Sequence, residues 1–574
     1  MAVTTGGARK EVPAARSLAA VIDFATRSHA RALALLVVVA LISILPGFFA
    51  IPPTDRDESR FAQATKQMIE TGEYVDIRFQ DDMRYKKPAG IYWLQAGVVK
   101  AGQALGVPQA LTTIWLYRIP SLVGALAAVL LTYWAALAFV TTRAAVFAGL
   151  MMASCLLLSV EGRIAKTDAM LLAAVVAAMG AMARAYLPEQ RRLTDARASW
   201  MLPAIFWTAL AAGVLLKGPV IVLFVGLAAL TLLVADRSAR WLMSLRPLVG
   251  AVWFALLVLP WFLAIVLRSG DTFLSESVGR DLLLKVVSGQ ESHGAPPGYY
   301  ALLYWGTFFP GAMLTGLAAP AIWAARREPG ARFLLAWVVP SWIVLEIVVT
   351  KLPHYVLPVY PAIAILLAGI MDARTLSRRP WLKGGTIWWF LMPLLASLAG
   401  LFALFTIGRQ FGLLVWPVIG ASLVMGLLAW RLYDADGPEH SLLRAVAAAL
   451  LLVIALFGLI VPALGPVFPS VALAKLLRES GCDEPVAASA GYHEPSLVFL
   501  AGTATRLTDG AGAAEFLRGG DCRFAFVELR QERNFGQRAD AIGLLYSQVG
   551  RIEAFNTGSG KSATIMVYRS GGPR

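Results

Sequence analysis

Charged residues and cysteines are scarce in this sequence. Only 15% of the 574 residues are Asp, Glu, Lys or Arg, whereas 58% are hydrophobic and the mean hydropathy is +0.66. Soluble domains carry about 25% charged residues, so a conventional soluble protein is excluded. The three cysteines, Cys155, Cys482 and Cys522, are too few for a disulfide scaffold and lack the spacing of a zinc site. The composition predicts a membrane protein.

Apolar runs long enough to cross a bilayer recur from residue 32 to residue 462. A helix needs about 20 apolar residues to span a hydrocarbon core of about 30 Å. We count thirteen such runs, at 32–51, 115–138, 143–160, 168–187, 200–215, 218–235, 247–268, 298–325, 333–350, 355–371, 384–407, 411–430 and 445–462. The run 90–106 is short and interrupted, and predicts an interfacial helix, with a fourteenth span as the alternative. The first run lacks a small-residue cleavage site after it, which favours an anchor over a removed signal peptide.

Basic residues gather on one side of the predicted spans. The tail 1–31 and the loops on its side hold 21 basic and 10 acidic residues, whereas the loops 52–114 and 269–297 and the tail 463–574 are close to neutral. The positive-inside rule therefore predicts a cytoplasmic N-terminus and places these three segments outside. The net charge of +15 mainly records this orientation and gives no support to nucleic-acid binding.

The tail 463–574 differs from the rest because its apolar runs shorten to strand length. The pattern predicts strands at 486–490, 524–529 and 564–568 and helices near 473–478, 511–517 and 540–548. We expect a small soluble α/β domain there. Cys482 and Cys522 would lie in an oxidising compartment, where they either pair or stay free. Cys155 lies within a span and is expected to be a small core residue.

Several charged residues remain at the external ends of spans, among them Asp168, Lys217 and Lys351. An ionisable group at membrane depth is expensive and is a functional candidate by default. A transporter more often places such groups at the midplane, in broken helices related by an internal repeat. The sequence shows neither feature, which favours an enzyme whose cavity opens to the outer face.

The first external loop carries three carboxylates within four residues and then a basic cluster. These residues are Asp55, Asp57, Glu58, Arg84, Lys86 and Lys87. Such a pattern is suited to an amino or polyhydroxylated substrate together with a phosphate, and a solvated charged loop is the alternative. Helix-forming residues follow at 59–68, which places Asp57 and Glu58 near a helix N-terminus, where the ionised forms are favoured.

The order and spacing of several short motifs resemble those of a known family. The motifs are Asp57-Glu58-x-Arg60 after the first span, Lys87-Pro88 with Trp93, an external Asp168, Leu216-Lys217-Gly218, Leu259-Pro260-Trp261, and Lys351-Leu352-Pro353-His354-Tyr355 with Pro358. Together they resemble the GT-C membrane glycosyltransferases, in the group that contains protein O-mannosyltransferases and the bacterial transferases of 4-amino-4-deoxy-L-arabinose to lipid A. The likeness runs from about residue 33 to residue 361.

The resemblance implies a polytopic α-helical membrane protein of GT-C type, with the soluble α/β domain on the periplasmic side of the bacterial inner membrane. It also implies undecaprenyl phosphate as the carrier of the donor sugar and a lipid A phosphate as the acceptor. Alternatives are a protein O-mannosyltransferase, another polyprenyl-phosphate-sugar transferase, and a flippase of lipid-linked sugars.

Inverting displacement at the anomeric carbon passes through an oxocarbenium-like transition state, and charge builds up on the departing lipid phosphate. Preorganised cations there stabilise the transition state. The candidates for the donor phosphate are Lys87, Arg60, Lys351, Tyr355 and Arg280. A lipid A phosphate is already an anion, so the carboxylates of Asp57, Glu58 and Asp168 are expected to orient substrate or hold the sugar ammonium. With a protein acceptor, Asp57 becomes the general base.

Further substrate contacts are expected from Tyr85, Lys86, Lys217 and His354. No cofactor is expected to be required, although His293 with Glu276 offers a possible divalent metal site. Structural alternatives are open for several of these residues: interfacial snorkelling for Lys87, a helix N-cap for Asp168, aromatic anchoring for Tyr85 and Tyr355, and a surface position for His293.

Overall fold

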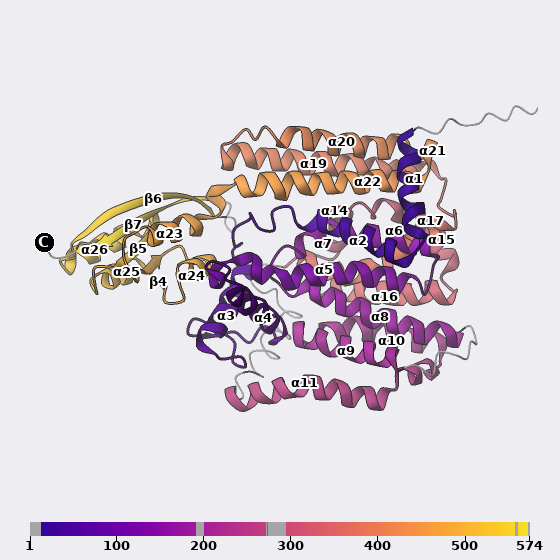
Figure 1. Ribbon diagram of the computed structural model, residues 1–574, viewed down its shortest axis with the longest axis horizontal. Coiled ribbons are helices and arrows are strands. Elements are labelled where there is room, and N and C mark those ends of the chain that lie inside the picture. The colour runs from indigo at the N-terminus through magenta and orange to yellow at the C-terminus, as the bar shows by residue number, and fades with distance from the viewer. Residues whose placement is uncertain (1–12, 191–199, 271–272, 274–293, 557–560, 572–574) are drawn as a thin grey trace, which may run out of the picture.

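The computed structural model describes residues 13–190, 200–270, 273, 294–556 and 561–571. Helices run side by side through most of the chain, and a smaller domain with a sheet projects from one end of them (Figure 1). Helix α1 (Pro13–Thr26) lies at the opposite end of the helical body. The expected class, a helical membrane protein with a C-terminal α/β domain, is confirmed.

Within the described residues, seven segments are long and apolar enough to cross a membrane, judged by length and composition. They comprise α5 (Ile114–Ala136), α8 (Asp168–Gln190), α11 (Pro247–Ser269), α16 (Pro329–Ile347), η5 (Pro353–Val359) with α17 (Tyr360–Asp372), α18 (Pro380–Lys383) through η6 (Gly384–Ile387) and α19 (Trp388–Ala403) to η7 (Leu404–Gly408), and α22 (Pro438–Val453) through η8 (Ile454–Ile460) to η9 (Val461–Ala463). Shorter apolar helices are α2 (His29–Ile44), α6 (Thr142–Ala153), α9 (Met201–Lys217), α10 (Val220–Asp236), α15 (Met313–Ala325) and α20 (Val415–Arg431). The number of thirteen spans stays a prediction.

Helix α8 lies inside the bundle. It is rich in Ala, and 83% of its most apolar window is buried, against 22% for α11. Small residues let helix backbones approach closely. A Cβ on Gly124 of α5 would lie only 2.6 Å from the backbone nitrogen of Met170 in α8. At the periphery, Leu248 and Leu267 of α11 are 85% and 86% exposed, as expected of side chains that face lipid.

Two predicted spans are broken where they were expected to be continuous. The run 143–160 is divided into α6 and α7 (Leu156–Glu161), and the run 298–325 into α14 (Tyr299–Thr307) and α15. Pro310 has no backbone N–H to continue the second helix. The two breaks meet, because the Leu156 N–H donates to the Phe309 carbonyl over 3.3 Å. Irregular backbone at membrane depth is tolerated when it is buried in protein. Helix α7, which follows the break after α6, ends at Glu161.

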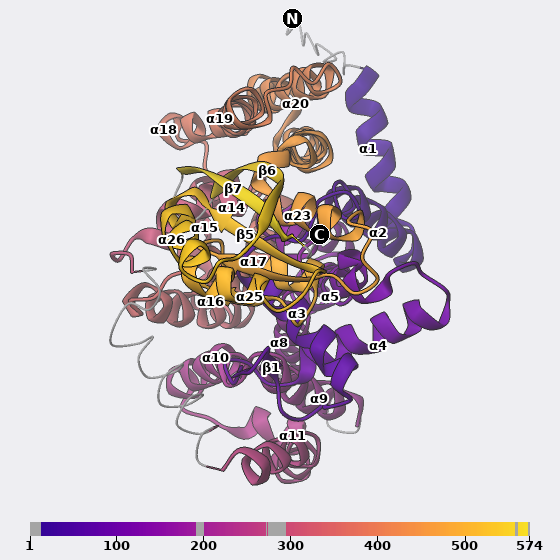
Figure 2. The same cartoon turned by 90° about the vertical axis from the view of Figure 1, so that its left-hand side faces the viewer.

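The segment 52–114 forms two helices at the end of the bundle that bears the C-terminal domain, as Figure 2 shows end-on. They are α3 (Asp57–Thr71) and α4 (Gly90–Ala104), with the short hairpin of β1 (Arg78–Phe79) and β2 (Asp82–Met83) between them and η1 (Ala110–Thr112) after them. A helix in the predicted range 90–106 is therefore confirmed, and its interfacial position stays a prediction. Short connecting elements complete the membrane part: η3 (Arg240–Leu245), α21 (Tyr433–Asp436) and η10 (Gly465–Val467).

The C-terminal domain has a five-stranded sheet in the order β4-β3-β5-β7-β6, in which β3 pairs parallel with β4 and β5 and the other pairs are antiparallel. Its elements are α23 (Pro469–Arg478), β3 (Val486–Ala490), α24 (Pro495–Ala501), β4 (Arg506–Thr508), α25 (Gly510–Leu517), β5 (Arg523–Glu528), η11 (Leu529–Gln531), α26 (Glu532–Ala541), β6 (Tyr546–Asn556) and β7 (Lys561–Ser570). Side chains alternate across the strands: Phe524 and Phe526 pack with α23 and α24, and Ala525 and Val527 pack with α25 and α26.

The predicted strands at 486–490, 524–529 and 564–568 and the helices near 473–478 and 511–517 are confirmed. The predicted helix at 540–548 is wrong. Helix α26 ends at Ala541 because Gly543 adopts a φ of +62°, and the Leu544 N–H closes the helix on the Ala539 carbonyl. Cys482 and Cys522 form a disulfide, and Cys155 is buried.

Candidate active site

A polar cavity of about 340 Å³ opens at the end of the bundle next to the C-terminal domain. Its walls come from the start of α3, the segment before α4, the loop 162–167, the ends of α8 and α9, and η5. The sequence-predicted residues that line it are Asp57, Glu58, Arg60, Lys86, Lys87, Asp168, Lys217, His354 and Tyr355. Segments separated by about 300 residues in sequence therefore meet in one place.

Asp57 is the first residue of α3, and its side chain is 49% exposed. The preceding residue, Arg56, adopts a φ of +66°, a conformation that non-glycine residues rarely take and that is typical of functional turns. Free N–H groups at a helix N-terminus favour a carboxylate. This placement keeps the Asp57 carboxylate near the N-terminus of α3 and open to the cavity.

Glu58 is fully buried and connects three segments. Its two carboxylate oxygens accept hydrogen bonds from Arg118 of α5 at 2.7 and 3.0 Å, from Thr54, and from the Ala165 N–H at 2.9 Å. Burial alone would raise the pKa of Glu58, but the Arg118 charge and these hydrogen bonds hold it below its ordinary value. Glu58 thus fixes the start of α3 against α5 and the loop 162–167, which is a positioning role.

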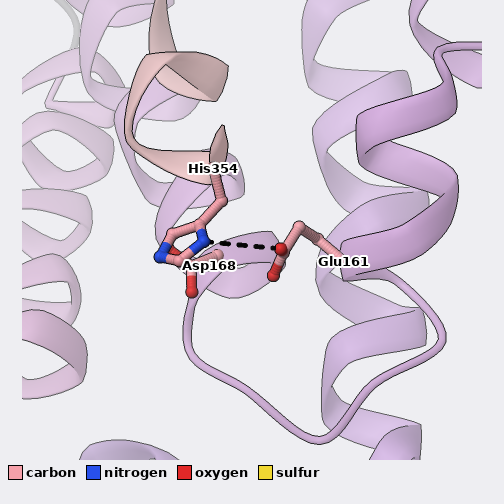
Figure 3. Close-up of side chains that lie close together, drawn as sticks. All are labelled: Glu161, Asp168 and His354. Carbon is pink, nitrogen blue, oxygen red and sulfur yellow. Dashed lines mark ion pairs between the residues drawn. The ribbon is translucent and has the colours of Figure 1, made fainter. Parts of the chain in front are cut away.

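A cluster of charged side chains lies deeper in the cavity. His354 is 3.7 Å from Glu161 through Nδ1 and 3.7 Å from Asp168 through Nε2 (Figure 3). Lys217 forms an ion pair with Asp168. Lys166 lies within 4 Å of both carboxylates. Asp168 begins α8, and its carboxylate is used for these charge contacts.

Sequence reasoning did not assign a role to Lys166 or Glu161. Both border predicted spans, where an ionisable group is a functional candidate by default, but neither belongs to the motifs that carry the family resemblance. Their position beside two spans was the available signal, and their burial in a wall of the bundle is known only from the structure. In the structure, Glu161 is 4% exposed and Lys166 is 8% exposed.

An apolar groove of about 200 Å³ continues from the polar cavity, and the two share Lys86, Lys87, Asp168, Lys217, Thr350, His354 and Tyr355. Beyond these residues its walls are apolar and come from α8, α10 and α16, including Leu171, Leu223, Phe224, Leu345 and Val348. A cationic rim that opens onto an apolar groove matches a ligand with an anionic head and a hydrocarbon tail. The geometry therefore suits a lipid phosphate.

Tyr85 and Lys351 lie outside the cavity wall, contrary to expectation. The Tyr85 hydroxyl donates to Asp76 at 2.9 Å, and its ring packs on Phe273. The Lys351 ammonium donates to the carbonyls of Val348 and Ala295, so it caps the end of α16. Both side chains satisfy local polar groups, which turns them away from the site. The expected phosphate residue Arg280 and the expected metal residues His293 and Glu276 lie outside the described residues.

The C-terminal domain contacts the cavity region directly. Helix α24 packs on α3, where Lys66 donates to the Phe499 carbonyl at 3.0 Å and Gln63 donates to Thr503 at 2.8 Å. Asp55 accepts a hydrogen bond from the Ser496 N–H at 3.3 Å. Burial raises the pKa of Asp55 to about 7. The domain therefore supports the turn that carries Asp57.

Comparison with known proteins agrees with this geometry. Residues 58–270 match the family model of dolichyl-phosphate-mannose-protein mannosyltransferases. The structure superposes on ArnT from Cupriavidus metallidurans bound to undecaprenyl phosphate, with a TM-score of 0.72, 20% identity, and coverage of 93% of this chain and 97% of that one. The chain has a GT-C glycosyltransferase fold.

The same fold appears in the apo structure of ArnT from Cupriavidus metallidurans, with a TM-score of 0.74, 19% identity, and coverage of 96% of this chain and 98% of that one. Among curated relatives, the undecaprenyl phosphate-alpha-4-amino-4-deoxy-L-arabinose arabinosyl transferase of Edwardsiella ictaluri is 28% identical over 75% of this chain and 76% of its own length. Its counterpart in Erwinia tasmaniensis is 27% identical over 66% of this chain and 69% of its own length. The GT-C resemblance expected from the short motifs is thus confirmed.

Proposed function

We propose that this protein transfers 4-amino-4-deoxy-L-arabinose from undecaprenyl phosphate to a phosphate of lipid A by inverting displacement. The observation that carries the proposal is the cationic cavity rim that opens onto an apolar groove, on the fold of a structure solved with undecaprenyl phosphate. The names of the curated relatives support the same sugar and carrier. The reaction takes place at the periplasmic face of the bacterial inner membrane, with the N-terminus in the cytoplasm.

The donor phosphate lies between the apolar groove and the polar cavity, held by Lys87, Lys86 and Arg60, with Tyr355 at the groove wall. Negative charge grows on this phosphate as the bond from the anomeric carbon to the phosphate oxygen breaks. Cations fixed before the reaction stabilise that charge more in the transition state than in the ground state. The lipid tail lies along the groove among side chains such as Leu223 and Leu345.

The acceptor phosphate attacks the anomeric carbon from the opposite face of the sugar. Its oxygen is already anionic near neutral pH, so deprotonation by a strong base is not required. Asp57 and Asp168 orient the sugar, and the half-exposed Asp57 carboxylate attracts the sugar ammonium. The phosphate of undecaprenyl phosphate leaves with the electron pair of the broken bond, and the chain's own side chains suffice for these steps without a cofactor.

Purified protein with labelled undecaprenyl-phospho-aminoarabinose and lipid A tests the proposal. Lipid A should gain the mass of one aminopentose. Asp57→Asn should lower the transfer rate by about 100-fold or more, whereas Asp82→Asn, at the exposed tip of the β1-β2 hairpin, should leave it unchanged. A lipid A that gains no mass, or an Asp57→Asn variant with full activity, contradicts the proposal.

The family model that matches residues 58–270 favours a protein O-mannosyltransferase as the second candidate. This activity needs a base for a Ser or Thr hydroxyl, and Asp57 would supply it. The same assay with a polyprenyl-phosphate mannose and a Ser/Thr peptide separates the two activities. A flippase of lipid-linked sugars would modify neither acceptor.

A further inference from the structure

Lys166 occupies the middle of an acidic cluster. Its Nζ lies 3.8 Å from Asp57 Oδ2, 3.8 Å from Glu161 Oε2 and 3.9 Å from Asp168 Oδ2. These distances exceed those of hydrogen bonds, so the ammonium lies among the three carboxylates without a close contact to any single one. Its side chain is 10% exposed.

The backbone of Lys166 is held firmly in this position. Its N–H donates to the Ser121 hydroxyl at 3.2 Å, and its carbonyl accepts from the same hydroxyl at 3.0 Å. The neighbouring Ala165 N–H donates to Glu58. Two buried anchors therefore fix the loop that presents the ammonium to the cavity.

The same cluster has the composition of a metal site. Single donor atoms of Glu161, Asp168 and His354 all lie within 4.8 Å of one another. Glu161 Oε2 is buried and accepts no hydrogen bond from the described part of the chain. Two carboxylates and an imidazole are donors that suit a divalent cation such as Mn²⁺ or Zn²⁺.

Positive charge already lies against these two carboxylates: Lys166 faces Glu161 Oε2 and Asp168 Oδ2, and His354 faces their other oxygens. Lys166 lies within 4 Å of both carboxylates, and Lys217 forms an ion pair with Asp168. A lysine amine carries a positive charge near neutral pH, and the carboxylates of Glu161, Asp168 and Asp57, each within 4 Å, favour that charged form. A divalent ion would have to displace this ammonium and would be repelled by Lys217.

We propose that Lys166 is the built-in cation of the Glu161–Asp168–His354 cluster, in the place that a divalent metal would otherwise take, and that it positions Asp57 for transfer. The metal-replacing role stands on the geometry of the cluster alone. The positioning role rests on the proposed function, because it concerns the carboxylate that orients the sugar.

Metal binding tests the first role without any substrate. Electron paramagnetic resonance of the detergent-purified full chain measures Mn²⁺ affinity for the original protein, Lys166→Ala and Lys166→Arg. Lys166→Ala should bind one Mn²⁺ at least 10-fold more tightly than the other two, and adding Glu161→Gln should abolish the gain. Lys66→Ala is the matched control, because Lys66 is also buried and lies 3.8 Å from Glu70, on the side of α3 that contacts the C-terminal domain. It should gain no Mn²⁺ site.

Transfer kinetics test the second role. The original protein should keep its rate after treatment with a chelator. Lys166→Ala should lower kcat at least 10-fold with little change in the KM for the donor, whose phosphate is held by Lys87, and Mn²⁺ should restore part of the rate. Lys166→Arg should retain most of the rate because it keeps the charge.

Two results would overturn the proposal. One is a Glu161-dependent Mn²⁺ site in the original protein as tight as that of Lys166→Ala. The other is a Lys166→Ala variant that neither gains Mn²⁺ nor loses kcat. If Lys166→Ala does not fold, the Mn²⁺ titration of the original protein, with Glu161→Gln as its control, still tests the metal-replacing role. Failure of the proposed transfer activity would leave the Mn²⁺ measurements unaffected, so the two failures are distinguishable.

Discussion

Replacing Arg118 by Leu should destabilise the protein strongly. Both side chains of the Glu58–Arg118 pair are 1% exposed, and the two charge-assisted hydrogen bonds measure 2.7 and 3.0 Å. The Arg118 guanidinium also donates to the carbonyls of Phe48, Ile51 and Pro52. The substitution leaves the Glu58 charge buried without its counterion and removes the partner of three carbonyl groups.

Removing one partner of a buried ion pair costs about 3–5 kcal/mol, since the remaining charge stays out of water. The assay is unfolding of the purified protein by SDS, followed by tryptophan fluorescence. Arg143→Leu is the matched control, because Arg143 pairs with Glu439 at 2.6 Å but their side chains are 33% and 29% exposed. An exposed pair contributes at most about 1 kcal/mol.

The double variant Glu58→Gln with Arg118→Leu should be more stable than Arg118→Leu alone, because it removes the buried unpaired charge. Transfer activity should fall in all variants that disrupt the pair, since Glu58 also holds Thr54 and the Ala165 N–H. If Arg118→Leu lowers the free energy of unfolding no more than Arg143→Leu does, the reasoning is refuted.

Three further outcomes are expected. Burial raises the pKa of Asp55 from its ordinary 3.8 to about 7 in the folded protein. The stability that protonated Asp55 contributes is therefore present at low pH and is lost as the pH rises towards 7. Over this pH range the protection of α24 from hydrogen exchange should fall, and it should fall less in Asp55→Asn. Gly124→Ala should push α8 away at Met170 and displace Asp168, and it should lower the free energy of unfolding by about 1–3 kcal/mol and reduce the transfer rate. An unchanged transfer rate would contradict the close contact. Cys482→Ala opens a disulfide between residues 40 apart in sequence and should lower the unfolding free energy of the C-terminal domain by about 2–4 kcal/mol, measured by thermal denaturation.

Periodicity and run length predicted the helical class, the separate α/β tail and most of its strands, because these depend on local apolar pattern. The strand at 486–490 was predicted at the bounds of β3. The helix at 540–548 failed because one glycine with positive φ ends α26 and the same apolar pattern then serves strand β6. The breaks near Cys155 and Pro310 were missed because apolarity continues through both.

The site was predicted in part. Asp57, Lys87 and Lys217 lie on the cavity wall, as the motifs suggested, although their catalytic and binding roles stay predictions. Lys351 was expected there as a charge at the end of a predicted span and as part of the motif 351–355, and Tyr85 was expected there as part of the segment 84–88. Adjacent side chains point in different directions, however, and Lys351 and Tyr85 form hydrogen bonds with Ala295 and Asp76 outside the cavity wall.

The sequence by itself determined that this chain enters a membrane, since 58% hydrophobic residues with charges confined mainly to loops suit no aqueous fold. It also predicted several segments that line the polar cavity, because charges near apolar runs are costly and are functional candidates by default. Only the tertiary structure decided which of those charges meet. Glu58 became a buried anchor and Lys166 the centre of an acidic cluster, because burial and partners depend on how α3, α5 and the loop 162–167 pack together, and local sequence carries no record of those distances.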